Sequence, residues 1–98
     1  MSNSYWTRGE VARLGVEIFD ASGLAADPGA LRCIVRSPNG TVSTATYGAA
    51  AGPVRDAAGV YRLDVPLGAA GIWAWRWEAD APYAGAAEGE LFVRGSRF

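Results

Sequence analysis

The chain has 98 residues, half of them hydrophobic, and a formal net charge of −1 with a pI near 5.2. This length predicts one domain with a single modest core that needs neither a metal nor a disulfide. The nine basic residues are all arginine and are scattered, so we expect no nucleic-acid binding. With one cysteine and no histidine, the chain lacks an intrachain disulfide, a cysteine zinc cluster and the usual general base.

The N-terminal residues lack the basic start and apolar run of a signal peptide. No apolar segment approaches the ~20 residues that cross a bilayer, so we expect no membrane association. We expect the protein to be synthesised in the cytoplasm. We interpret residues 1–8 as an N-terminal arm, residues 9–94 as the folded domain and residues 95–98 as a C-terminal tail.

Glycine and proline recur about every ten residues, which is typical of an all-β sandwich or barrel. Val11–Phe19 alternates apolar with polar or small residues and predicts a half-buried strand that ends at the turn Asp20–Gly23. Leu31–Ser37 predicts a strand with its odd-numbered residues inward. Pro38–Thr41 contains Asn-Gly and predicts a tight hairpin turn, because both residues readily adopt positive φ. Val42–Tyr47 is the returning strand, near an edge.

The second half of the chain predicts three further strands. Val60–Leu67 follows the turn Asp56–Gly59 and ends near Pro66, which marks a strand end or an edge. Ile72–Ala79 and Ala87–Arg94 are separated by a loop that contains proline and glycine. No stretch shows convincing helical periodicity. We therefore predict an all-β fold of about seven antiparallel strands in two packed sheets.

Three of the four tryptophans, Trp73, Trp75 and Trp77, alternate along one predicted strand and share a face. They form either the core or an exposed platform for sugar rings or a partner's side chains. The apolar rows on neighbouring strands need an apolar partner sheet, which favours the core for Trp73 and Trp75. Trp77 lies at the open end of the strand, and both interpretations remain for it. Trp6 either covers one end of the sandwich or contacts a partner.

Cys33 lies at an inward strand position and is interpreted as a small buried hydrophobe rather than a nucleophile. A group of carboxylates, which could catalyse proton transfer or bind calcium, falls on adjacent predicted strands and their loop: Glu78, Asp80, Glu88 and Glu90. Arg76 and Arg94 alternate with them, as cross-strand pairs do on solvated faces. We therefore expect no metal, no cofactor and no enzymatic activity; a hydrolase using Glu78 or Glu90 is the remaining alternative.

The sequence resembles a short immunoglobulin-like β-sandwich without a disulfide. The matching elements run from Gly9-Glu10 through the strand that ends at Ile18–Gly23, and continue with Val35–Gly40, Gly59–Val65, Gly71–Trp77 and Gly89–Val93. From first to last they span nearly the whole chain. Their order is similar to that in small proteins encoded among the structural genes of tailed bacteriophages and gene transfer agents. The unpaired Cys33 and the late position of the tryptophans depart from the antibody-type pattern.

This resemblance implies a non-enzymatic component of a phage-like virion, made in the bacterial host cytoplasm and present in many symmetric copies. The expected role is a capsid decoration or cement protein that binds the major capsid protein. Alternatives are a head–tail connector or tail component, and a carbohydrate- or protein-binding module that uses exposed tryptophans. The expected contact residues are aromatic or arginine, types enriched at interface hot spots: Tyr5, Trp6, Arg8, Trp77, Arg97 and Phe98. The alternative is that both chain ends are frayed termini.

Overall fold

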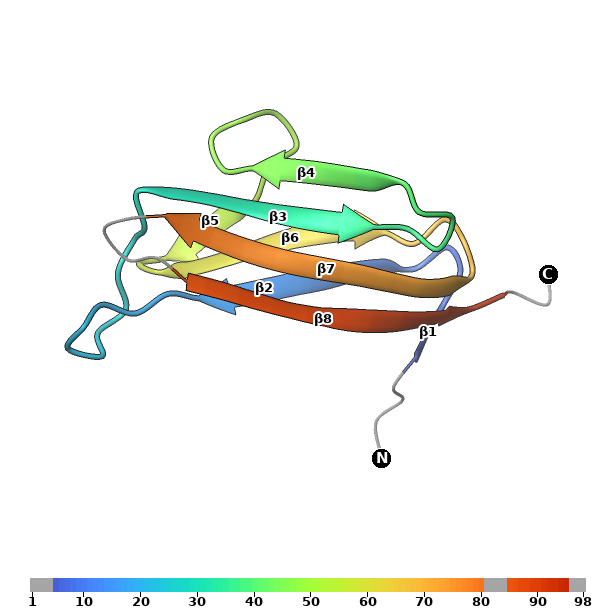
Figure 1. Cartoon of the computed structure of the whole chain (residues 1–98), viewed down its shortest axis with the longest axis horizontal. Coiled ribbons are helices and arrows are strands. Elements are labelled where there is room, and N and C mark those ends of the chain that lie inside the picture. The colour runs from blue at the N-terminus through green and yellow to red at the C-terminus, as the bar shows by residue number, and fades with distance from the viewer. Residues whose placement is uncertain (1–4, 81–84, 96–98) are drawn as a thin grey trace.

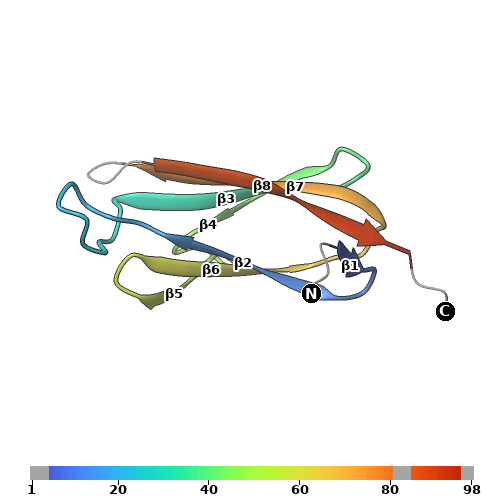
Figure 2. The same cartoon turned by 90° about the horizontal axis from the view of Figure 1, so that it is seen from below.

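The computed structural model describes residues 5–80 and 85–95, and these residues form eight strands and no helix. The strands are β1 (Tyr5–Thr7), β2 (Val11–Glu17), β3 (Ala30–Arg36), β4 (Val42–Thr46), β5 (Val54–Ala57), β6 (Val60–Pro66), β7 (Gly71–Asp80) and β8 (Gly85–Arg94). A five-stranded sheet has the order β1-β8-β7-β3-β4, and a three-stranded sheet has the order β2-β6-β5. The two sheets stack as layers (Figures 1 and 2).

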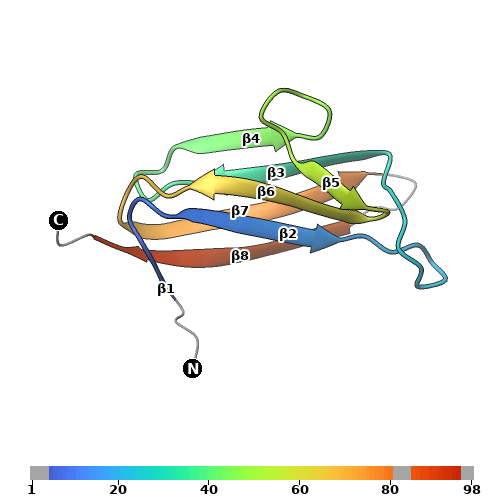
Figure 3. The same cartoon turned by 180° about the vertical axis from the view of Figure 1, so that it is seen from behind.

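The strand order is that of an immunoglobulin-like sandwich. In such domains a sheet of strands B, E and D packs on a sheet of C, F and G that can be extended by C′. Strands β2, β6 and β5 occupy the first set of positions, and β3, β7, β8 and β4 occupy the second. Figure 3 shows the three-stranded sheet in front of the larger one. The predicted fold class is confirmed, with no disulfide at Cys33.

One pairing differs from the antiparallel prediction. Strand β1 runs parallel to β8, with Tyr5 opposite Phe92 and Trp6 opposite Val93. The backbone N–H of Arg8 continues this contact by donating to the carbonyl of Arg94 at 2.9 Å. Residues 5–7 therefore belong to the sheet rather than to a free N-terminal arm, and residues 1–4 and 96–98 lie outside the described residues.

Strand β5 was not predicted from the sequence. All four of its residues are exposed, so the segment has no apolar alternation that would reveal it. The turn predicted at Asp56–Gly59 is present, and it connects β5 to β6 as an antiparallel hairpin. Gly59 in this turn has φ +70°, and a Cβ there would stand 2.5 Å from the carbonyl oxygen of Ile18. Only glycine fits at that position.

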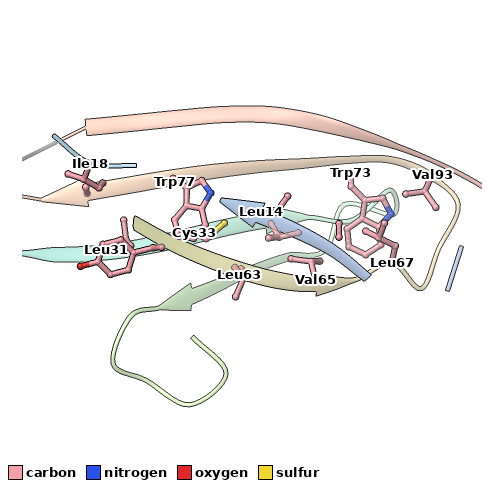
Figure 4. Packing of buried hydrophobic residues seen from close by; sticks show 14 residues of the cluster. Leu14, Ile18, Leu31, Cys33, Leu63, Val65, Leu67, Trp73, Trp77 and Val93 are labelled. Carbon is pink, nitrogen blue, oxygen red and sulfur yellow. The ribbon is translucent and has the colours of Figure 1, made fainter. Parts of the chain in front are cut away.

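The core fills the space between the sheets, as the alternation of the sequence predicts. Its buried side chains come from both sheets and include Ala12, Leu14, Leu31, Cys33, Val35, Tyr61, Leu63, Val65, Leu67 and Val93. Figure 4 shows Trp73 and Trp77 projecting into this layer toward opposite ends. Of the two interpretations that the sequence leaves open for Trp77, burial in the core is the one observed, because its side chain is only 1% exposed. Both β3 and β8 pair with β7 beyond this residue, so Trp77 does not lie at an open end.

The connection from β2 to β3 is fastened to the β5–β6 hairpin by Asp27. Its carboxylate accepts two hydrogen bonds from the Arg55 guanidinium, both at 3.0 Å. The Gly59 N–H and the Tyr61 hydroxyl donate to the same carboxylate, each at 2.9 Å. These donors, Arg55 foremost, hold the pKa of Asp27 well below its usual value. The residues are far apart in sequence, and no sequence pattern pointed to this cluster.

Candidate functional site

The solvent side of the five-stranded sheet is the candidate functional surface. On β7 the side chains that alternate with the tryptophans point away from the core, and the strand registers place outward residues of β3, β4 and β8 beside them. We call this surface the outer face. Its residues are Arg32, Ile34, Arg36, Val42, Thr44, Thr46, Ile72, Ala74, Arg76, Glu78, Glu88, Glu90 and Phe92. Figure 1 looks onto it.

One end of the outer face is a ladder of ion pairs across three strands. Arg32 contacts Glu78 at 2.8 Å and Asp80 at 3.2 Å, and Arg76 contacts Glu78 at 2.8 Å and Glu88 at 3.2 Å. The hydrogen bonds from Arg76 and then Arg32 lower the pKa of Glu78. A carboxylate held in this way is a poor general acid. The interpretation of these residues as solvated cross-strand pairs is confirmed for Glu78, Asp80 and Glu88.

The other end of the outer face is apolar. Ile72 and Phe92 are direct cross-strand neighbours and are 53% and 52% exposed. Val42 lies in the neighbouring row of residues and is 55% exposed. Large apolar side chains that gather on one face with a polar border are typical of a contact surface. The sequence predicted these three positions as strand residues, but only the registers bring them onto one surface.

A hollow of about 500 Å³ separates the two ends. Its lining includes Ile34, Arg36, Ala74, Glu88 and Glu90. Ala74 contributes only a methyl group between longer neighbours, which is why the surface is recessed there. Arg36 and Glu90 flank Ala74, one on each adjacent strand, and within the described residues neither forms an ion pair.

A second space, of about 430 Å³, opens between the sheets beside β4 and β6. Core residues line it, among them Cys33, Leu63 and Trp73. Burial raises the pKa of the Cys33 thiol to about 11, so the thiol is protonated at neutral pH and is a poor nucleophile. Within residues 5–80 and 85–95 no three acidic or thiol side chains are grouped as metal ligands would be.

Of the predicted contact residues, the three whose side chains the structure describes do not share one surface. Trp6 is partly buried and packs against the core, Arg8 is exposed, and Trp77 is buried. The prediction that Trp77 contacts a partner is wrong, because the two sheets of the sandwich cover its indole. Tyr5 is placed only through its backbone pairing in β1, and Arg97 and Phe98 lie outside the described residues.

Comparison with known proteins assigns no family. No protein-family model matches the chain, and no curated protein or solved structure matches it either. Among the described residues there is no helix with the length and apolarity needed to span a membrane.

Proposed function

We propose that this chain is a non-enzymatic protein-binding module, that it is a structural component of a phage-like particle, and that the outer face is its contact surface. The observation that carries the binding role is the exposed cross-strand pair of Ile72 and Phe92, with Val42 on the same face and the Arg32–Glu78–Arg76 ladder at its other end. Protein interfaces combine exposed apolar contacts with charged groups that stay partly solvated.

The resemblance to small proteins of tailed bacteriophages supports the particle setting. In that setting the chain is a capsid decoration protein that binds the major capsid protein, and a head–tail connector or tail component is the alternative. Two sheets packed over a single core present the outer face as a fixed surface, which suits repeated contacts in a symmetric assembly.

A sugar-binding platform receives less support. Trp73 and Trp77 are directed into the core, and Trp75 is partly buried and packs against it. No row of adjacent exposed indoles therefore exists among the described residues. Stacking on sugars needs an accessible aromatic face, so we do not propose carbohydrate binding.

The particle role is tested by quantitative mass spectrometry of phage-like particles purified from cells that express the chain. Ile72→Glu places a charge on the outer face, and Val54→Glu places the same charge on β5, where the side chain is 46% exposed. We expect the wild type and Val54→Glu to co-purify in many copies per particle and Ile72→Glu to be lost. Circular dichroism of the purified variants confirms that each is folded.

Each outcome bears on one half of the proposal. Absence of the wild-type chain from particles would overturn the structural role. Retention of Ile72→Glu at the wild-type copy number would remove the outer face as the contact surface.

A further inference from the structure

The two charges that flank Ala74 suggest the partner of the outer face. Arg36, Ala74 and Glu90 form one row across β3, β7 and β8. Neighbouring strands are about 4.8 Å apart, so the cation and the anion lie at similar distances on the two sides of β7. The row therefore carries a positive charge on the β3 side of β7 and a negative charge on the β8 side, and it borders the hollow on the outer face.

We infer that a second copy of this chain binds the outer face, with a two-fold axis that runs along β7. The inference rests on the proposed function, in which the outer face is a protein contact surface. A two-fold rotation about β7 exchanges the β3 side with the β8 side. Arg36 of each copy then faces Glu90 of the other, so the contact contains two equivalent ion pairs. Such self-complementarity is what a two-fold interface requires.

The apolar end of the outer face fits the same arrangement. On the axis Ala74 meets Ala74 of the second copy, and these small side chains allow the two sheets to approach closely. Ile72 in the neighbouring row meets its counterpart, and Phe92 flanks it. The association therefore removes from water two of the most exposed apolar side chains of β7 and β8.

The size of the molecule permits a stable contact. Its extents are 48 × 32 × 19 Å, and the view down the shortest axis in Figure 1 looks onto the outer face. A standard interface needs only about 800 Å² from each partner. Aligned sheets pack with their strands crossing at about 30°. Arg76 lies as far from Ala74 on β7 as Ile72 does, so it also faces its counterpart, and Glu78 and Glu88 neutralise each guanidinium within its own copy.

Pairing through the edge of β4 is the competing arrangement for two copies. The strand carries no charged residue and no proline, the usual protections of an edge. However, the following loop turns back over its end, where the Ala49 N–H donates to the Thr46 carbonyl at 3.1 Å. A Cβ on Gly52 would stand 2.1 Å from the same carbonyl oxygen, so that end of the edge is covered.

Sedimentation velocity of the purified chain tests the inference. Arg36→Glu sets two carboxylates against each other in each of the two contacts, and Glu90→Arg sets two guanidiniums against each other. We expect each variant to dimerise at least about tenfold more weakly than the wild type. Glu17→Arg on β2 is the control, because Glu17 is exposed and without an ion pair in the described structure, and it should leave the dimer unchanged.

Mixing the two variants gives the sharper result. A heterodimer of Arg36→Glu with Glu90→Arg contains two ion pairs: the native one, between Glu90 of the first variant and Arg36 of the second, and one with its signs exchanged. The mixture should therefore dimerise while each variant alone does not. A monomeric wild type at all concentrations would overturn the inference. So would a dimer that neither variant weakens, which would indicate the β4 edge instead.

The two proposals fail separately. A chain that is present in particles but monomeric in isolation retains the structural role and loses the two-fold contact. A chain that dimerises through Arg36 and Glu90 but is absent from particles retains the contact and loses the particle role.

Discussion

The indole of Trp75 lies against Gly89, its neighbour across β7 and β8, so closely that a Cβ on residue 89 would stand 2.6 Å from the ring atom Cζ2. The aromatic ring thus occupies the space that a side chain on β8 would need. Glycine is normally unfavourable within a strand, and here close approach by a neighbour accounts for it.

Gly89→Ala should destabilise the fold by about 1–3 kcal/mol, because the added methyl group displaces the Trp75 ring from a packed site. Urea unfolding followed by tryptophan fluorescence measures the change. Gly15→Ala is the matched control on β2, since a Cβ there meets nothing closer than the Tyr61 carbonyl at 3.8 Å. We expect that control to be neutral or slightly stabilising. Equal losses from both substitutions would contradict the close contact.

Trp77→Ala should cost about 3–5 kcal/mol, since it leaves a large cavity at a side chain that is 1% exposed. Trp75→Ala should cost less, because Trp75 is only partly buried. Denaturant titration of both variants compares the two losses directly. A Trp75→Ala loss as large as that of Trp77→Ala would mean that the two indoles are packed to the same extent.

Asp27→Asn should lower the melting temperature at pH 7, and the difference from the wild type should shrink at acid pH. The folded state lowers the pKa of Asp27 below the ordinary value of 3.8, with Arg55 as the main cause. Stability from this carboxylate is therefore complete above about pH 5 and is lost as the pH falls through and below 3.8.

Calorimetry at pH 7 and near pH 2.5 measures that difference. Asp56→Asn is a suitable control, because it also removes a carboxylate paired with an arginine on the three-stranded sheet, Arg62, at 3.0 Å. If the difference in melting temperature between Asp27→Asn and the wild type did not change with pH, the negative charge of Asp27 would not be what holds the β2–β3 connection in place.

The Cys33 thiol should resist modification in the native protein. It is completely buried, and burial raises its pKa to about 11, so little thiolate is present at pH 8. We expect a chromogenic disulfide reagent to react slowly under native conditions and quickly in denaturant. Rapid native reaction would show that the space beside β4 and β6 opens readily to solvent.

Much of the sandwich follows from local sequence patterns. The alternation in Val60–Leu67 identifies its buried row, and Asn39-Gly40 marks the β3–β4 hairpin, where Gly40 has φ +91°. The short strands β1 and β5 escape this reasoning. Strand β5 is exposed throughout, and β1 is defined by its pairing with β8 at the far end of the chain.

The candidate site was less accessible to sequence reasoning than the fold. Ile72 and Phe92 stand twenty positions apart, and their contact depends on the register of the β7–β8 hairpin. Arg36 and Glu90 meet the same row only because β3 and β8 lie on opposite sides of β7. Alternation shows that such residues point outward, but it does not show which outward residues are neighbours. The position of Trp77 stayed open for the same reason, because the sequence does not show how far the neighbouring strands extend.

The pairing of β1 with β8 has a consequence for synthesis on the ribosome. The larger sheet joins the beginning of the chain to its last strand, so neither β1 nor β7 has its final neighbour until β8 has emerged. Until then the nascent chain exposes an open edge on its most tryptophan-rich strand, which is the kind of surface that aggregates. The larger sheet therefore cannot be completed until β8 has been synthesised, and a pause before β8 prolongs the exposure of that edge.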